Sequence, residues 1–262
     1  MPELPEVNTV MKVFRTKVLN KTIVQVEVHD DHILRNCSAD EFIHRLLGHK
    51  FVDTYRRGKY FFARLDHGHD VLFHLGMTGD PVYYKPGEEP PRHERFSLHF
   101  SHDIIMGYND PRKFSRIHYL EDRNQYIHDL GLGPDALKVT WKKFQQIMNG
   151  KKGQLKALLL DQSLLAGVGN LYADEICYQA RLHPASKLDK LSAEELKTVY
   201  QRMHAILQKA VDLDAYYKVY PADWFWTWRE KNKTGPNGES VKTIKVGGRT
   251  TYYVEGWQKW VK

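Results

Sequence analysis

Cysteine is almost missing from this chain, whose 262 residues include only Cys37 and Cys177. Two thiols cannot build a disulfide framework or a four-cysteine zinc site. The chain also has no apolar run long enough to cross a membrane, and its N-terminus has no apolar signal region. We therefore expect a cytoplasmic protein with no secretion signal and no membrane partner.

Acidic residues are outnumbered, because 39 Lys and Arg face 32 Asp and Glu, a formal charge of +7. The isoelectric point lies near 9.1. Such a balance suits a polyanionic partner, although a basic enzyme without one is a fair alternative. Part of the excess lies in residues 221–262, where eight basic residues face four acidic ones, a net charge of +4.

Hydrophobic periodicity predicts a β-rich first half with flanking helices. Apolar residues recur at helical spacing after the N-terminus, at Val7, Val10, Met11, Phe14 and Val18. Ser38 and Glu41 form a capping-box pattern for a short helix through Leu47. The stretch "TIVQVEV" alternates valines with polar residues, as a half-buried strand does. From about residue 51 to 120 short β-like runs follow: "KYFFARL", "VLFHL", "FSLHF", "DIIMGY" and "SRIHYL". These runs predict a β-sandwich or barrel.

After "LGLGPDAL" the pattern becomes helical, through residues 140–150 and 154–182. A further helix starts at a capping box, Ser192 with Glu195, and carries a long apolar face. Near the C-terminus, "VKTIKV" and "RTTYYV" flank Gly247-Gly248, which is typical of a two-residue hairpin turn. We therefore expect three parts: a β-rich domain, a helical domain and a terminal β-hairpin.

The opening "MPELPEV" offers a candidate nucleophile. If Met1 is removed, Pro2 becomes a terminal secondary amine that titrates near ~7.7–8.0, so a useful fraction is unprotonated at neutral pH. Such an amine can form a Schiff base, and the adjacent Glu3 and nearby Glu6 can move protons. The same residues also fit an ordinary helix start, with Pro5 in the first turn.

Three more stretches offer contacts to nucleic acid, each with an ordinary alternative. "GVGNLYADE" can present backbone N–H groups to an anion, with Asn170 as a helix cap, or it can be a tight turn between helices. "LGMTG" and "NDPRKF" can expose Met77, Arg112 and Phe114 for insertion into a base stack, or Met and Phe can be core residues. Arg249 follows the Gly-Gly turn and can bind a phosphate there.

Together these stretches resemble the formamidopyrimidine-DNA glycosylase and endonuclease VIII family of base-excision repair enzymes. The resemblance covers nearly the whole chain. It rests on "PELPEV", "RGKYFF", "HLGMTG", "DPRKF", "LGLGPDAL" and "LLLDQSLLAGVGNLYADE", in this order. It implies an α+β, multidomain fold: an N-terminal β-sandwich with flanking helices at 1–133, a helix-two-turn-helix domain at 134–220 and a β-hairpin finger at 221–262.

The resemblance also implies the chemistry. Pro2 attacks C1′ of the damaged nucleotide, and Glu3 supports proton transfer as the base leaves and the sugar ring opens. The resulting iminium makes the neighbouring sugar C–H acidic, so the strand breaks by β- and then δ-elimination. Lys59 matches a lysine that contacts phosphate and assists elimination. Arg249 matches the finger arginine that grips the phosphates flanking the lesion.

Further residues match the family's lesion pocket and DNA contacts. Glu6 would line the lesion pocket. The backbone contacts implied by the resemblance are His93, Lys152, Lys156 and Asn170. Met77, Arg112 and Phe114 match the residues that fill the gap left by a flipped nucleotide. Because Arg112 offers only donors, it suits the acceptors of an orphaned cytosine, which points to oxidised guanine as the lesion.

The sequence departs from the family at the finger, where four cysteines usually hold zinc. Val254 and Trp257 stand at the positions of the last pair. Aromatic residues can supply packing in place of the metal, namely Trp224, Trp226, Trp228, Tyr252, Trp257 and Trp260. The histidines of "DHGHD" are expected to be turn residues. We therefore predict no metal site and no cofactor.

The prediction for function is a bifunctional DNA glycosylase and AP lyase that removes 8-oxoguanine and formamidopyrimidines from duplex DNA. Its partner would be double-stranded DNA with oxidised bases or abasic sites, bound by a monomer of bacterial, nucleoid-associated type. Two alternatives stay open: an endonuclease VIII-like glycosylase for oxidised pyrimidines, and an inactive damage-binding protein. The second conflicts with Pro2, Glu3, Lys59 and Arg249, because binding alone requires no terminal secondary amine.

Overall fold

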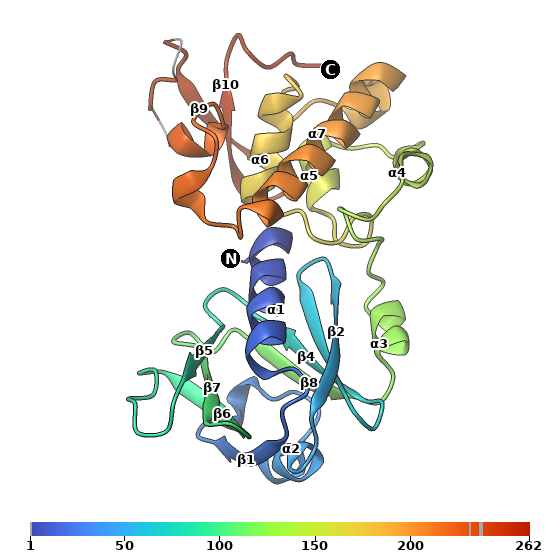
Figure 1. The fold of residues 1–262 in the computed structure, drawn as a ribbon. Coiled ribbons are helices and arrows are strands. Elements are labelled where there is room, and N and C mark those ends of the chain that lie inside the picture. The colour runs from blue at the N-terminus through green and yellow to red at the C-terminus, as the bar shows by residue number, and fades with distance from the viewer. Residues whose placement is uncertain (1, 231, 236–237) are drawn as a thin grey trace. The chain divides into compact units, whose positions relative to one another are not determined.

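The computed structural model describes residues 2–230, 232–235 and 238–262 (Figure 1). The chain divides into two compact units, residues 1–131 and 132–262, and each is described by itself. The finer division predicted at residues 133 and 220 remains a proposal. No helix in the described parts of the chain is long and apolar enough to cross a membrane.

The first unit begins with helix α1 (Leu4–Val18), which has Pro5 in its first turn. Its predicted apolar face is confirmed, because Val7, Phe14 and Val18 are fully buried. The capping box predicted at Ser38 and Glu41 is also confirmed and starts α2 (Ala39–Leu46). Two short elements complete the helices of this unit: η1 (Asp31–Ile33) and α3 (Arg123–Asp129).

Two antiparallel four-stranded sheets form the rest of this unit, in the orders β1-β6-β7-β5 and β2-β3-β4-β8. The strands are β1 (Ile23–Val28), β2 (Phe51–Arg57), β3 (Tyr60–Leu65), β4 (Asp70–His74), β5 (Asp80–Tyr84), β6 (Glu94–Phe100), β7 (Ile104–Asn109) and β8 (Arg116–Leu120). Aromatic rings from both sheets meet in one core. The ring centres of Phe73 in β4 and Tyr108 in β7 lie 6.1 Å apart. The predicted β-sandwich is therefore confirmed.

Two local features depart from the periodicity. The alternation in "TIVQVEV" predicts that Val24 is buried, but this side chain is 56% exposed. The pairing of β1 with β6 shifts between Ile23 and Gln25, and a bulge of this kind turns the extra residue out of the alternation. Strand β5 was not singled out by its pattern, and its Pro81 is tolerated because β5 is an edge strand.

The second unit contains α4 (Trp141–Met148), α5 (Leu155–Leu160), α6 (Asn170–Gln179) and α7 (Ala193–Asp212). The helical pattern predicted over 154–182 is interrupted between α5 and α6. There the Asp161 carboxylate accepts hydrogen bonds from the Ser163 N–H and hydroxyl at 2.9 and 2.6 Å. Such side-chain acceptors compete with the helix and favour a turn.

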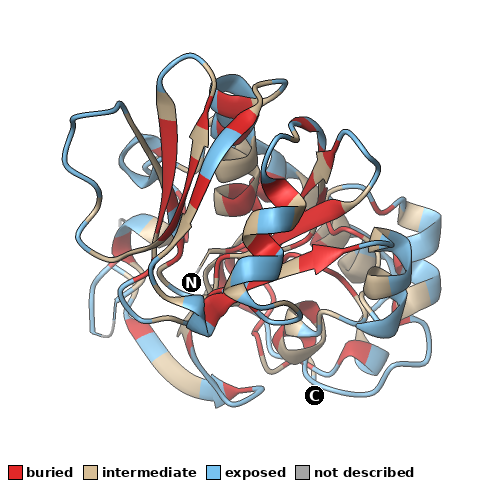
Figure 2. Cartoon of the chain, turned by 90° about the horizontal axis from the view of Figure 1, so that it is seen from below, coloured by how far each residue is buried: buried red, intermediate tan, exposed pale blue. Residues whose placement is uncertain are grey.

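The C-terminal segment forms the predicted hairpin, β9 (Val241–Val246) with β10 (Arg249–Val254). Gly247 and Gly248 have φ of 56° and 73°, as a two-residue turn of this twist requires. The described residues of this unit also form three single-turn helices: η2 (Leu188–Lys190), η3 (Tyr217–Val219) and η4 (Phe225–Trp228). Figure 2 shows buried residues along the strands and on one side of the helices, with exposed residues on the loops.

Candidate active site

Pro2 lines a small pocket of the first unit. Pro2 is half-buried there, and the pocket is also lined by Val7, Lys59, His74, Leu75 and Gly76. Glu3 is only 5% exposed. Its N–H donates to the Glu6 Oε2 at 2.8 Å, which ties the residues after Pro2 to the start of α1. The capped start of α1 therefore directly follows Pro2.

Lys59 enters this pocket from the turn between β2 and β3. Arg57 pairs with Tyr60, so Gly58 and Lys59 form a two-residue turn. Gly58 has a φ of 58°, a conformation that glycine adopts without strain. From this tight turn Lys59 lines the same pocket as Pro2, and its charge acts on His74.

His74 is a pocket residue that sequence reasoning did not single out, although it stands in the quoted motif "HLGMTG". It ends β4 and lines both the pocket of Pro2 and a second, neighbouring pocket. Burial, followed by the charges of Arg116 and Lys59, lowers the pKa of His74 to about 4. Its Nδ1 has no hydrogen-bond partner among the described residues. His74 is therefore a neutral imidazole at pH 7.

The second pocket brings Met77, Arg112 and Phe114 together, from two loops that are far apart in the sequence. Met77 is 38% and Phe114 48% exposed, so neither is a core residue. The Arg112 guanidinium carbon lies 4.6 Å from the centre of the Phe114 ring. Three further cations line the pocket, namely Arg35, Lys113 and Arg116.

Glycine allows the two loops to approach closely. A Cβ on Gly76 would lie 2.8 Å from the Ser115 backbone nitrogen, and one on Gly79 would overlap the Ser115 hydroxyl. Separations this short force the backbone to move. Both glycines flank Met77, so they set its distance from the loop that carries Arg112 and Phe114.

Asp110 joins the same two loops through hydrogen bonds. This buried carboxylate accepts from the Thr78 hydroxyl at 2.5 Å and from the Ser115 N–H at 2.9 Å. Burial acts to raise the pKa of Asp110, but the bonds from Thr78, Ser115 and Arg112 outweigh it and the pKa is lowered. A charged Asp110 therefore holds Met77 and Arg112 in fixed relation.

His93 lies next to this loop, in the segment before β6. Its N–H donates to the Asn109 side-chain oxygen at 3.2 Å, and its carbonyl accepts from the Asp110 N–H at 3.0 Å. The residue is half-buried. Its backbone thus supports the loop that carries Arg112.

In the second unit, Lys156 and Asn170 are joined to strand β10. The Lys156 Nζ donates to the Asn170 Oδ1 and to the Thr251 hydroxyl, each at 2.7 Å. Asn170 in turn donates to the Thr250 carbonyl at 3.2 Å. Asn170 was expected to cap its helix, but it is the first residue of α6 and Gly169 takes the cap position.

Lys156 is fully buried, although it was predicted to contact DNA. Its Nζ also forms an ion pair with Asp174 at 2.7 Å, and Asp174 in turn binds Arg229 at 2.6 Å. The Tyr252 N–H donates to the same carboxylate at 3.3 Å. Burial lowers the pKa of Lys156 and raises that of Asp174. Asp174 thus links α5, α6 and β10, a role that sequence reasoning missed within "NLYADE".

Arg249 is exposed at the tip of the hairpin, where it begins β10. A Cβ placed on Gly247 would lie 3.3 Å from the Ala157 Cβ, so the tip rests on α5. Lys152 is exposed in the segment just before α5. The hairpin tip therefore rests on α5. The first turn of this helix contains Lys156, whose amine binds Asn170.

Aromatic packing supports the hairpin, as expected. Its buried cluster contains Tyr178, Phe225, Trp228, Val241 and Val254. Trp257 is half-buried and donates from Nε1 to the Tyr178 carbonyl at 3.2 Å. Trp260 was expected to pack here too, but it is 54% exposed and stacks on His183 instead.

A buried carboxylate completes this support. Glu175 accepts hydrogen bonds from the backbone N–H groups of Phe225 and Trp226, at 3.2 and 2.9 Å, and so caps η4. Burial raises the pKa of Glu175 to about 7. The helix α6 thereby holds the segment that leads into the hairpin.

The sequence of this chain matches two protein-family models and several known proteins. The sequence model of the formamidopyrimidine-DNA glycosylase N-terminal domain matches residues 1–117, and that of the formamidopyrimidine-DNA glycosylase H2TH domain matches residues 130–218. The formamidopyrimidine-DNA glycosylase of Arabidopsis thaliana is 32% identical over 278 residues, covering 99% of this chain and 71% of the relative. The Mycoplasma mobile enzyme is 30% identical, with 99% of each chain covered. The chain belongs to the formamidopyrimidine-DNA glycosylase family. It is thus a DNA-repair glycosylase.

Solved structures agree on the fold. The Lactococcus lactis Fpg protein, in a complex with DNA that contains Fapy-dG, matches with a TM-score of 0.88 at 23% identity and covers 98% of this chain and 100% of that one. A MutM structure with carbocyclic 8-oxo-G in its DNA matches with a TM-score of 0.88 at 24% identity, over the same shares. The predicted β-sandwich, helical domain and hairpin are confirmed as this fold.

Proposed function

We propose that this glycosylase removes oxidised purines from duplex DNA and then cleaves the strand at the abasic site. The observation that carries the proposal is the small pocket that Pro2 lines together with Lys59 and His74, whose imidazole is neutral. Once Met1 is removed, Pro2 would offer a secondary amine in this pocket. The names of relatives that act on formamidopyrimidines, and solved complexes with Fapy-dG or 8-oxo-G in DNA, support the lesion class.

The proposed reaction begins once Met1 is removed. The unprotonated Pro2 nitrogen attacks C1′, the glycosidic bond breaks, and the base leaves with a proton. The bond between C1′ and the ring oxygen then opens, with a proton delivered to that oxygen, to leave an iminium on Pro2. We assign the transfer of these protons to the Glu3 carboxyl, which is positioned next to Pro2 at the cap of α1.

Strand cleavage follows from the iminium. It acidifies the C2′–H, so loss of that proton expels the 3′ phosphate, and a second elimination expels the 5′ phosphate. We assign to Lys59 the stabilisation of the leaving phosphate charge, because its ammonium shares the pocket with Pro2. Water finally hydrolyses the Schiff base and frees the Pro2 amine.

The exposed residues of the second pocket would fill the gap in the duplex. Met77 and Phe114 offer apolar surface that can enter a base stack, and Arg112 offers donors alone. Cytosine presents acceptors at O2 and N3, so Arg112 suits a cytosine that has lost its partner. Glu6 is assigned to the lesion pocket, next to Glu3. A pairing of Arg112 with the unpartnered cytosine favours lesions derived from guanine over oxidised pyrimidines.

Phosphate contacts are assigned to cations and polar groups at the surface. Lys152 and Arg249 are exposed and have the chemistry for this role. Asn170 and His93 are assigned to the same backbone contacts. Because the Lys156 amine is fully buried, we propose that it acts by holding Asn170 and Thr251 instead of touching DNA.

Borohydride trapping tests the nucleophile. Borohydride should reduce the iminium to a stable amine and cross-link the processed protein to duplex DNA with 8-oxoguanine opposite cytosine. The matched control is the same chain with Met1 retained, in which Pro2 is an amide and trapping should be lost. If the two forms trap DNA equally, Pro2 is not the nucleophile.

The lesion class is tested with the same assay. We expect faster cross-linking and incision of the 8-oxoguanine duplex than of a matched duplex with an oxidised pyrimidine. The reverse order, with trapping still dependent on a free Pro2, would retain the mechanism and replace the substrate class.

A further inference from the structure

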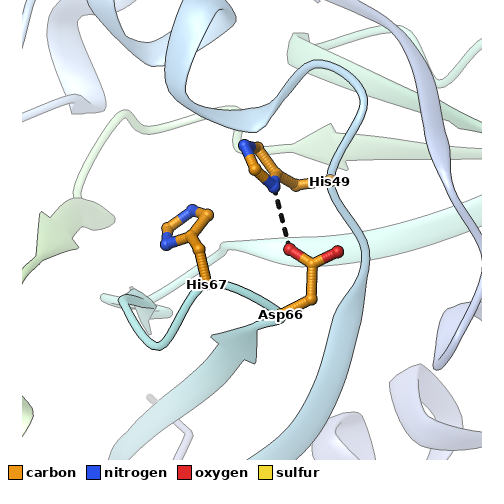
Figure 3. A group of neighbouring side chains, drawn as sticks. All are labelled: His49, Asp66 and His67. Atoms are coloured by element: carbon orange, nitrogen blue, oxygen red, sulfur yellow. Dashed lines mark hydrogen bonds and ion pairs between the residues drawn. The ribbon is translucent and has the colours of Figure 1, made fainter.

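A cluster of metal-ligating side chains lies outside the site described above, at one edge of the first unit. His49 precedes β2, while Asp66 and His67 lie in the turn between β3 and β4. Their donor atoms all lie within 4.8 Å of one another. In Figure 3 the His49 ring and the Asp66 carboxylate point toward one another, with His67 beside them. The His49 Nδ1 and Asp66 Oδ1 are 2.8 Å apart.

The backbone beneath the cluster is fixed. The Asp66 N–H donates to the Lys50 carbonyl at 3.0 Å, which joins the turn to the residue after His49. Within the turn, the Leu65 N–H donates to the His69 carbonyl at 2.8 Å and the Gly68 N–H to the Leu65 carbonyl at 3.0 Å. The three ligating side chains therefore project from ordered backbone, and their separations change only by rotation about side-chain bonds.

These separations suit a small ion. Zinc binds imidazole nitrogen and carboxylate oxygen at about 2.0–2.2 Å, so tetrahedral ligands lie about 3.3–3.5 Å apart. The donor atoms of the three side chains lie at most 4.8 Å apart, so a shift of about 1.5 Å brings them to the separation that zinc requires. Asp66 and His67 are exposed and His49 is half-buried, so all three side chains have room for this rotation.

The surroundings differ from those of an ordinary histidine–carboxylate pair. The His49 and His67 rings are 4.3 Å apart, and His69 lies 4.7 Å beyond His67. Three imidazoles therefore lie one beside the next, and the donor atoms of two of them, His49 and His67, lie within 4.8 Å of that of Asp66. The Tyr119 hydroxyl is 2.8 Å from the His69 Nδ1 and 3.5 Å from the His67 Nε2. A partner for the second ring nitrogen orients a metal-binding histidine and fixes its tautomer.

We propose that His49, Asp66 and His67 bind a divalent transition-metal ion of the zinc class, with water in the remaining position. Two imidazoles and one carboxylate favour zinc, nickel or copper over magnesium and calcium, which prefer oxygen ligands. The bound ion would fasten the segment before β2 to the β3–β4 turn. This site is unrelated to the finger, where residues 221–262 contain neither Cys nor His. The pattern "DHGHD" predicted turn residues alone, because His49 joins them only in the fold.

Calorimetric titration with Zn²⁺ tests the site, with the full chain free of any affinity tag and stripped of metal by a chelator. We expect one Zn²⁺ per chain and no comparable binding of Mg²⁺. Changing His49→Ala or His67→Ala should weaken binding at least about tenfold, since even a lost outer partner costs 10–100-fold. His128→Ala is the matched control, because the His128 side chain is 84% exposed and its Nδ1 lies 3.4 Å from the Asp129 Oδ1, with no third ligand grouped with them among the described residues.

Two further measurements separate binding from folding. Zn²⁺ should raise the melting temperature of the wild type and of His128→Ala, but not that of His67→Ala, since only a ligand of the folded state stabilises it. Zn²⁺ should also shift the NMR signals of the His49 and His67 ring nitrogens. His67→Gln keeps the polarity of the side chain. In the absence of metal it should therefore have the same melting temperature as the wild type. No Zn²⁺ binding by the wild type, or equal binding by folded His67→Ala, would overturn the proposal.

Discussion

His74 illustrates how burial and neighbouring charge select one protonation state. His74 is the last residue of β4, and its ring lies between two pockets. The positive charges of Arg116 and Lys59 disfavour a further positive charge on this imidazole. Burial contributes the largest part, because a cation loses hydration there. A neutral imidazole in the pocket of Pro2 can accept a hydrogen bond through its unpartnered Nδ1 and does not repel the Lys59 ammonium.

An NMR titration of His74 should therefore show protonation only near pH 4, where its pKa lies. Since the folded-state pKa is below the ordinary value of 6.5, His74 contributes stability above pH 6.5, and this is lost as pH falls through 4. Arg116→Ala should move the midpoint upward, because it removes the largest charge effect. A midpoint near 6.5 in the folded wild type would contradict this account of the pocket.

At the scale of elements, one ionic cluster holds α5, α6 and β10. Lys156, Asp174 and Arg229 meet with little or no exposure of their side chains, and the ion-pair distances are 2.6–2.7 Å. A buried pair of this kind adds little net stability compared with apolar packing, but loss of one partner leaves an uncompensated charge. The cluster therefore fixes the relation of Asn170 to Thr250 and Thr251.

Lys156→Met should lower the free energy of unfolding by about 3–5 kcal/mol, because the buried Asp174 carboxylate would lose one of its two cationic partners. Lys152→Met is the matched control: Lys152 is exposed and its loss should change stability by less than about 0.5 kcal/mol. Urea unfolding measures both. Equal, small effects would show that the amine of Lys156 is not the partner on which the cluster depends.

Strand and helix positions were largely predictable, since short β-like runs identified β3, β4, β6, β7 and β8, and capping boxes identified α2 and α7. The exceptions have local causes, such as the bulge that exposes Val24 and the Asp161 turn that divides a helical run. Site residues were predicted from motifs. His74, Asp174 and His49 were not, because their roles depend on partners that only the fold brings near.

At the scale of the whole molecule, the basic balance is expressed on both units. In the first, Arg35, Arg112, Lys113 and Arg116 line one pocket. In the second, Lys152 and Arg249 are exposed, and residues 221–262 carry a net charge of +4. Lys113 has a local partner, Asp30, at 2.5 Å, and Arg249 is at the hairpin tip. The charge of a side chain thus does not by itself identify the cations that bind a polyanion. Its place in the fold and its local partners also decide.

The salt dependence of DNA binding tests this distinction at Arg249. Each phosphate neutralised lowers the logarithm of affinity by about 0.9 per tenfold rise in salt, because counterions are released. Arg249→Ala should therefore reduce the slope by about one contact, with a uniform loss across sequences and slower incision. Lys242→Ala is the control on the same hairpin, because Lys242 pairs with Glu255 and should leave the slope unchanged. Equal slopes for wild type and Arg249→Ala, measured by fluorescence anisotropy on one duplex that carries an uncleavable tetrahydrofuran analogue of the abasic site, would remove Arg249 from the phosphate contacts.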